Sequence, residues 1–212
     1  MFVYNKNIMD ELAKEYEFLC GKKSDINEHL PTLYKYAMES NVILELGVRN
    51  CISTWSFALG LVHNNNKETK KLIVNDIIEC NIGKFEKAIK DTNIQLEKHW
   101  QNDLTLELSE KVDLLFIDTW HIYGQLIREL EKFHSLVHKY IILHDTTTFA
   151  TRPEPARHAI IKHSMEKFNI TKDEIKKGLK PALDEFLANH SEWQIKEVFT
   201  NNNGLTILER KV

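Results

Sequence analysis

The sequence predicts an α/β protein with a mostly parallel sheet, helices on both faces of the sheet and an antiparallel hairpin at the end of the chain. Largely apolar runs, such as 41–48 and 112–117, alternate with stretches of helical periodicity. Such strands are typical of a parallel sheet that is buried on both faces. The segment 193–211 differs, because two extended runs flank the turn NNNG at 201–204, and this pattern predicts the hairpin.

Each expected helix or strand is indicated by its own local sequence pattern. Apolar residues recur at helical spacing over 8–20, and Pro31 suits the first turn of a second helix over 31–40. The expected core elements follow as strand 41–48, helix 53–62, strand 70–76, helix 82–92, a short strand before Asn102, strand 112–117, helix 122–137 and strand 140–145. We predict one domain over 1–212, with N-terminal helices over 1–40 and the sheet over 41–212.

Composition excludes several classes of function. The 212 residues are 42% hydrophobic and 28% charged, which is typical of globular proteins. The formal net charge of -3 disfavours a nucleic-acid partner, and no apolar run is long enough for a membrane span. The first residues are too charged for a signal peptide. Three cysteines without metal-type spacing indicate a reduced, cytoplasmic protein.

Acidic residues stand at or near the carboxyl ends of the expected strands. Ligands of open α/β sheets bind beyond these ends. Capping alone would not require so many carboxylates there, so we expect a ligand site. The five acidic residues are Glu45, Asp76, Asp103, Asp118 and Asp145.

A tight turn at Gly47 leads from the first core strand into a helix that opens with Ser53 and Thr54. The unpaired N–H groups of a helix amino terminus suit an anionic group, although a plain turn with a serine cap explains the segment equally well. Asp76 ends the next strand and can accept both hydroxyls of a ribose. Only one glycine of a dinucleotide fingerprint is present, so a nucleotide-sugar or dinucleotide enzyme is the weaker alternative.

Asp118 and His121 follow one strand, and His144 and Asp145 end the next. A carboxylate can hold a cation and an imidazole can accept a proton near neutral pH. A helix cap with a surface histidine is the alternative. Neighbouring parallel strands would bring Asp118 and Asp145 together, and two such carboxylates repel each other unless a cation, a proton or a positive group lies between them.

Three further features are open to two interpretations. His29 is expected to be a cap or loop residue, or else to line a ligand. Trp120 lies between Asp118 and His121 and can form a wall of the pocket. The segment 152–159 is expected to be a flexible connection, or else a lid over the site.

Taken together, "VILELGVRNCIST", "IVNDI", "LLFIDTWHIYGQLIREL" and "YIILHDTTTF" resemble the successive motifs of class I S-adenosylmethionine-dependent methyltransferases. The likeness is greatest to small-molecule O-methyltransferases related to the cephalosporin-biosynthesis and macrolide-sugar enzymes. The closing segment 178–210 also resembles that group, so the resemblance spans nearly the whole chain. It implies a Rossmann-like class I methyltransferase sheet.

The resemblance also implies S-adenosylmethionine as cofactor and S-adenosylhomocysteine as product. In that family the glycine turn wraps the methionine part, the acid after the second strand binds the ribose, and the acid after the third strand faces the adenine amine. The implied cofactor-binding residues are Glu45, Gly47, Ser53, Asp76, Asp103 and Asp118.

In metal-dependent relatives, Asp-x-x-His supplies a metal ligand and a general base, and the next strand ends in Glu-Asp, both metal ligands. The resemblance therefore implies Asp118, His144 and Asp145 as ligands of a divalent metal such as Mg²⁺ or Mn²⁺, with His121 as base. The expected catalytic residues are His121, Asp118 and His144. An imidazole in place of glutamate implies either that the reaction does not depend on a metal or that the ion is softer than Mg²⁺. Cys51 stands where many members have a second glycine.

The expected function is methyl transfer to a hydroxyl of a small molecule, with a sugar or glycan as the favoured acceptor. A non-catalytic cofactor-binding partner is a further alternative. A homo-oligomer is compatible with the sequence, whereas a nucleic acid or a membrane is not an expected partner.

Overall fold

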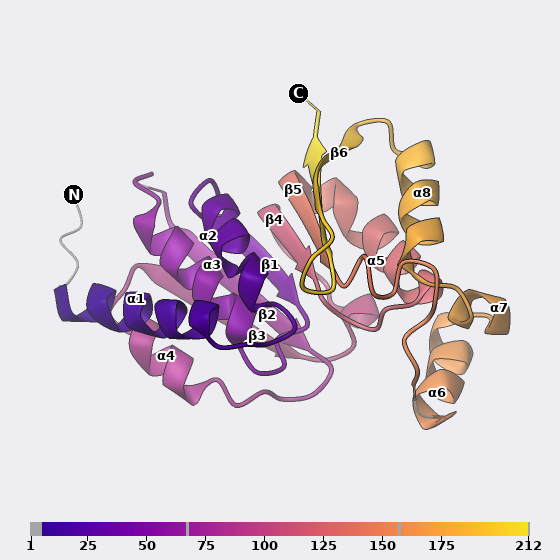
Figure 1. Ribbon diagram of the computed structural model, residues 1–212, viewed down its shortest axis with the longest axis horizontal. Helices are drawn as coiled ribbons and strands as arrows, with labels where there is room; N and C mark the ends of the chain where they lie inside the picture. The colour runs from indigo at the N-terminus through magenta and orange to yellow at the C-terminus, as the bar shows by residue number, and fades with distance from the viewer. Residues whose placement is uncertain (1–5, 67, 157, 212) are drawn as a thin grey trace.

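The structure of the protein is a computed structural model, and it describes residues 6–66, 68–156 and 158–211. A seven-stranded sheet has the order β3-β2-β1-β4-β5-β7-β6 (Figure 1). Strands β1 to β5 are parallel, whereas β7 is antiparallel to both β5 and β6. The strands are β1 Val42–Leu46, β2 Lys70–Asp76, β3 Ile94–Trp100, β4 Val112–Ile117, β5 Val137–His144, β6 Trp193–Phe199 and β7 Leu205–Arg210.

The predicted fold class is confirmed, and the position of β7 refines it. The common dinucleotide-binding sheet has strand order 3-2-1-4-5-6. Here β7 is inserted between β5 and β6 and runs antiparallel to both. The chain reverses at Asn202, Asn203 and Gly204, which all have positive φ. Asparagine and glycine tolerate this left-handed backbone, so the NNNG turn predicted by the sequence closes the hairpin.

Helices cover both faces of the sheet and define two hydrophobic cores. Ile43 and Leu114 pack in the core with α1 to α4, while their neighbours Leu44 and Leu115 pack in the core with α5 and α8. This alternation follows from the two-residue period of a strand. The helices are α1 Lys6–Gly21, α2 Leu30–Ala37, α3 Ile52–His63, α4 Gly83–Ile89, α5 Tyr123–Phe133, α6 His158–Phe168, α7 Lys172–Ile175 and α8 Leu179–Asn189.

The expected helix over 122–137 is too long. Helix α5 ends at Phe133, a 3₁₀ turn spans His134–Leu136, and β5 begins at Val137. Val137 pairs with Val112 of β4, so parallel strand pairing recruits residues that the sequence pattern assigns to the helix. The strand expected over 140–145 therefore begins three residues earlier and ends at His144.

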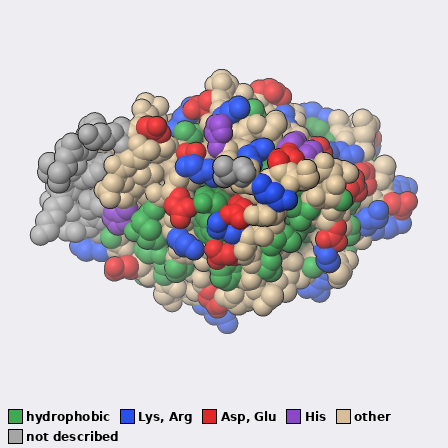
Figure 2. All heavy atoms as spheres, turned by 90° about the horizontal axis from the view of Figure 1, so that it is seen from above, with side chains coloured by type: hydrophobic (Ala, Val, Ile, Leu, Met, Phe, Trp, Pro, Cys, Tyr) green, Lys and Arg blue, Asp and Glu red, His purple; other side chains and the backbone are tan. Residues whose placement is uncertain are grey.

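Among the described residues, no helix combines the length and hydrophobicity needed to cross a bilayer. Figure 2 shows acidic and basic side chains interspersed on the face of the molecule seen from above.

Gly47 provides a test of how closely β1 and β4 approach. Its φ is +92°, and an added Cβ would lie 2.0 Å from the carbonyl oxygen of Asp118. We expect Gly47→Ala to lower the free energy of unfolding by roughly 2 to 5 kcal/mol, because backbone strain and steric overlap add. Urea denaturation measures the change. Gly21→Ala is the control, since no atom lies within 4 Å of its added Cβ; equal effects of the two substitutions would contradict this role of Gly47.

Candidate functional site

The turn after β1 is anchored by the acid at the end of β2. One oxygen of Asp76 accepts hydrogen bonds from the backbone N–H groups of Val48 and Arg49, both at 2.9 Å. Its other oxygen accepts a bond from Ile78 N–H at 3.2 Å. A carboxylate offers about four lone-pair positions, so these contacts leave room for one further donor rather than the two ribose hydroxyls expected from the sequence.

Two apolar residues that the sequence analysis did not select follow Asp76 directly. Ile77 is 60% exposed and Ile78 is 71% exposed. Exposed isoleucines beside a ligand-type carboxylate offer a surface on which a flat apolar group can pack. Their position immediately after the predicted ribose acid was the available sequence signal.

Glu45 lies in β1 and is fully buried. The hydroxyl of Ser53 donates a hydrogen bond to Oε1, while Oε2 has no hydrogen-bond partner among the described residues. Burial raises the pKa of Glu45 to about 8, so the carboxyl holds a proton at neutral pH. The serine-cap interpretation of Ser53 is wrong: Cys51 is the N-cap of α3, in a left-handed conformation and without a side-chain cap bond.

Asp103 is buried in a 3₁₀ turn, Asp103–Thr105. Gln125 of α5 donates to both carboxylate oxygens, at 2.9 and 3.1 Å, and also to Glu129 at 2.9 Å. Burial, together with the charge of Asp103, raises the pKa of Glu129 well above its usual value. The acid expected to face an adenine amine is thus already part of a buried hydrogen-bond network.

The carboxyl ends of β4 and β5 bring Asp118, His121 and Asp145 together. The Nε2 atom of His121 lies 3.2 Å from Asp118 Oδ1 and 3.2 Å from Asp145 Oδ2. One ligand-type atom from each of the three residues lies within 4.8 Å of the others, close enough to surround a metal ion. This set differs in one residue from the predicted metal set, because it contains His121 where the sequence analysis places His144.

His121 supplies the positive charge that offsets the repulsion between the carboxylates of Asp118 and Asp145. Burial lowers its pKa, but bonds to Asp118 and Glu154 and the charge of Asp145 outweigh that effect and raise the pKa to about 9. His121 is therefore protonated at neutral pH and lies between Asp118 and Asp145 as the positive group that they need. Burial opposes ionisation of Asp118, yet bonds from His121 and His144 hold its pKa well below the usual range.

His144 is buried at the end of β5. Its Nδ1 donates to Asp118 Oδ1 at 3.2 Å and lies 3.8 Å from Asp145 Oδ2. Its Nε2 is buried without a hydrogen-bond partner among the described residues, as is Oδ1 of Asp145. The predicted ligands Asp118, His144 and Asp145 are thus neighbours, with two polar atoms that no described side chain or backbone group satisfies.

The connection after β5 reaches the site through Glu154 and Phe149, which the sequence analysis did not select. Glu154 Oε2 accepts from Nδ1 of His121 at 2.9 Å and from its backbone N–H at 3.1 Å. The ring of Phe149 stacks on His121 with centroids 5.0 Å apart and planes 9° apart. The indole N–H of Trp120 donates to the carbonyl of Glu154. Glu154 of the segment 152–159, of which residue 157 is not described, therefore contacts the edge of the imidazole, whereas Phe149, which precedes this segment, covers its face.

His29 joins the amino-terminal helices to the closing hairpin. It is buried, and its Nε2 donates to the carbonyl oxygens of Asn201 and Asn202 at 3.0 and 3.1 Å. Its ring meets that of His144 edge to face, with centroids 5.8 Å apart. His29 ends the 3₁₀ turn Asn27–His29 and occupies the N-cap position of α2 without a side-chain cap bond, so it is a cap by position rather than a loop residue, and its ring borders the site.

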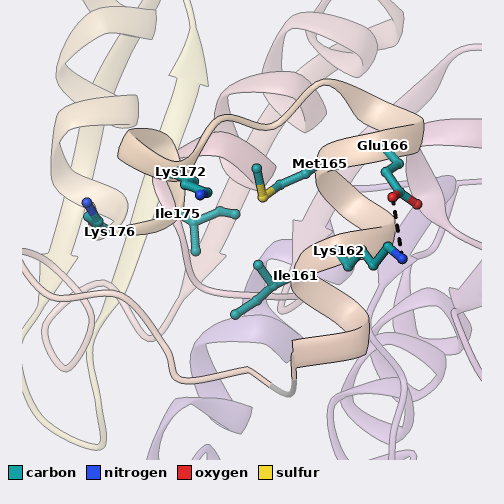
Figure 3. Close-up of a pocket in the computed structure, with 7 residues that line it drawn as sticks. All are labelled: Ile161, Lys162, Met165, Glu166, Lys172, Ile175 and Lys176. Carbon is teal, nitrogen blue, oxygen red and sulfur yellow. Dashed lines mark ion pairs between the residues drawn. The ribbon is translucent and has the colours of Figure 1, made fainter.

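Two cavities differ in their relation to this site. A small cavity of about 10 Å³, enough for one water molecule, borders Trp120, His121 and His144. An open apolar pocket of about 410 Å³ lies between α6 and α7, where Met165 and Ile175 point toward each other (Figure 3). That pocket contains none of the predicted site residues.

No family model and no curated protein matches this chain, but solved structures share its fold. A putative caffeoyl-CoA O-methyltransferase from Staphylococcus aureus has a TM-score of 0.58 and 13% identity over 97% of this chain and 93% of its own. The SAH-bound methyltransferase PaMTH1 of Podospora anserina has a TM-score of 0.56 and 14% identity over 100% and 99%. The N-methyltransferase NodS of Bradyrhizobium japonicum WM9 has a TM-score of 0.56 and 13% identity over 89% and 97%. The chain has the Rossmann-like fold of class I methyltransferases.

The buried carboxyl of Glu45 predicts a pH-dependent stability. Its pKa is raised in the folded protein, so its contribution is fully present below about pH 4.5 and is lost as pH rises through about 8. We expect this residue to lower the free energy of unfolding by up to about 1.4 kcal/mol per pH unit across that interval. Glu45→Gln, which keeps the shape but does not titrate, should flatten the profile in urea denaturation. A variant with the wild-type slope would show that Glu45 is not the group responsible.

Proposed function

We propose that this protein transfers a methyl group from S-adenosylmethionine to a hydroxyl group of a small acceptor, and that the acceptor is a sugar. One observation carries the proposal. A glycine turn, a ribose-type acid and a histidine between two carboxylates lie together at the carboxyl ends of four neighbouring strands. The methyltransferase fold supports the transfer class. The hydroxyl and the sugar rest on the sequence resemblance and on the chemistry of the histidine cluster.

The cofactor would lie across the carboxyl ends of β1 and β2. Gly47 allows close approach of the methionine part, and the unpaired Oε2 of Glu45 suits its ammonium group, which would draw the proton from this carboxyl. Asp76 has one acceptor position left for a ribose hydroxyl. Ile77 would pack on the adenine, whose amine would share Asp103 with Gln125. The sulfonium supplies an electrophilic methyl carbon.

We propose that a divalent ion would bind beside this position. Asp118, Asp145 and His144 would hold it, since Oδ1 of Asp145 lacks a partner and Nδ1 of His144 faces both carboxylates. The mixed oxygen and nitrogen donors favour an ion softer than Mg²⁺. When bound, the ion supplies the positive charge that protonated His121 otherwise provides, and it lowers the pKa of an acceptor hydroxyl.

His121 is the proposed general base; the bound ion would lower the pKa of this imidazole by like-charge repulsion, so that Nε2 would be free to accept the proton. Glu154 holds its Nδ1 and thereby directs Nε2 toward Asp118 and Asp145, where the acceptor oxygen would lie. Phe149 fixes the ring plane by stacking. An alcohol is a weaker acid than a catechol, so removal of its proton depends more on a positioned base. This favours a sugar hydroxyl as the acceptor for which such a cluster is needed.

A methyl-transfer screen tests the function directly. Sugars, glycans, catechols and amines would be offered with labelled S-adenosylmethionine, with and without divalent metals. Labelled sugar is the expected product. Exclusive labelling of amines would overturn the hydroxyl assignment, and stabilisation by NAD but not by S-adenosylhomocysteine would overturn the cofactor assignment.

The adenine position can be tested at an exposed residue, where a substitution has little effect on folding. We expect Ile77→Ser to weaken S-adenosylhomocysteine binding roughly 10- to 100-fold in calorimetry, the usual effect of losing a buried apolar side chain. Ile195→Ser, at a 49% exposed position on β6, is the matched control and should bind normally. Equal affinity of both variants would place the adenine elsewhere.

Kinetic measurements can distinguish a role of His121 as general base from a role in cofactor binding. We expect His121→Ala to lower kcat by roughly 100- to 10,000-fold, the usual value of general-base catalysis, with nearly unchanged S-adenosylhomocysteine affinity. Glu154→Gln should lower kcat less and displace the pH optimum, because it alters only the orientation and basicity of the imidazole. If His144→Ala abolishes turnover while His121→Ala remains active, the base belongs to β5 instead.

A further inference from the structure

We propose that a second cluster of side chains, formed by Glu131, His134 and His190, binds a divalent transition-metal ion of the zinc type. One nitrogen of each histidine and one carboxylate oxygen of Glu131 lie within 4.8 Å of one another. The cluster is distinct from the catalytic histidines, and the proposal does not depend on methyl transfer.

Two consecutive elements and one distant element contribute these side chains. Glu131 lies near the end of α5, His134 opens the 3₁₀ turn that precedes β5, and His190 is the C-cap of α8. Glu131 Oε1 lies 2.9 Å from His190 Nε2, and the two imidazole rings have centroids 4.1 Å apart. Donor atoms of a tetrahedral zinc site lie roughly 3.3 Å apart, so a small movement of His134 would complete the geometry.

A second carboxylate supports the cluster from outside. Glu192 Oε1 lies 3.5 Å from Nδ1 of His134 and 3.5 Å from Nδ1 of His190. With His190 bound to the ion through Nε2, Nδ1 would face this carboxylate, the arrangement that orients and strengthens histidine ligands. Nδ1 of His134 is buried and has no hydrogen-bond partner among the described residues, and a buried polar atom in that state destabilises the fold unless it binds something.

The ligand atoms of the cluster and the charges around them determine which class of ion it would bind. Two imidazoles and a carboxylate suit zinc and its neighbours, whereas magnesium and calcium prefer oxygen ligands alone. Arg210 is the positive group nearby, but it donates to the backbone carbonyls of His134 and Val137 rather than to Glu131 or Glu192. Two carboxylates therefore face one cation, and the 46% exposure of the Glu131 side chain leaves a path from solvent.

The location assigns the ion a structural role. His134 precedes β5 and His144 ends it, so the cluster lies roughly 20 to 25 Å from the carboxyl end of the sheet at 3.3 Å per residue. An ion at this point would tie α5 and the start of β5 to the end of α8. It would stabilise these connections without touching the reacting groups.

The test uses the full-length chain with Asp118→Asn and Asp145→Asn, which removes the catalytic cluster as a competing site. Titration calorimetry with ZnCl₂ should show one equivalent bound, and CoCl₂ should give visible d–d absorption. Excess Zn²⁺ at about a hundredfold over Kd should raise the melting temperature by roughly 5 to 10 °C. Adding His134→Gln and His190→Gln should abolish all three signals.

His163→Gln in the same background is the matched control, because His163 is an exposed histidine of α6. It should retain the bound equivalent, and Glu131→Gln should weaken Zn²⁺ binding at least 10-fold. The proposal is overturned if the Asp118→Asn/Asp145→Asn protein binds no Zn²⁺, or if binding survives His134→Gln and His190→Gln. Failure of methyl transfer would leave these readouts unchanged, so the two proposals fail separately.

Discussion

The parallel pairing of β4 with β5 is the constraint on which the candidate site depends. Ile117 pairs with Leu143, so Asp118, which follows β4, lies beside His144, the last residue of β5. Asp145 then turns in a left-handed conformation with φ of 59°. Two carboxylates are thereby brought together at a partly buried edge, where their repulsion must be compensated. The imidazole of His121 provides that compensation.

Three buried acids around this sheet are stabilised in three different ways. Glu45 keeps its proton and accepts a hydrogen bond from the hydroxyl of Ser53. Asp103 accepts hydrogen bonds from the side-chain amide of Gln125, and Asp118 is paired with the imidazoles of His121 and His144. Burying a carboxylate is costly without such partners. The partner differs because each carboxylate lies at or near the end of a different strand and meets a different neighbour. The histidine cluster combines an exchangeable proton with contacts to the connection after β5, and we propose it as the reactive part.

The two ends of β5 have contrasting chemistry. The carboxyl end carries His144 and Asp145 beside His121, the proposed base, whereas the amino end follows His134 and its carboxylate partners. Both clusters use imidazole and carboxylate groups, but Phe149 and Glu154 contact the first, whereas the exposed side chain of Glu131 leaves the second a path from solvent. Burial lowers the pKa of both His121 and His134, but only at His121 do the carboxylate partners outweigh this effect and raise the pKa.

The sequence was sufficient to predict the alternation of strands and helices, the hairpin at 201–204 and the acids at or near the strand ends, because these depend on local periodicity and on turn residues; it placed the start of β5 three residues too late. It also placed Asp118 and Asp145 as neighbours, since parallel strands share their carboxyl edge. Tertiary structure alone decided that Glu154 and Phe149 hold His121, that backbone amides occupy most of Asp76, and that strand pairing ends α5 at Phe133. Those contacts join residues tens of positions apart. Local patterns carry no information on them, because side-chain packing and hydrogen-bond satisfaction are settled only when the whole chain has folded.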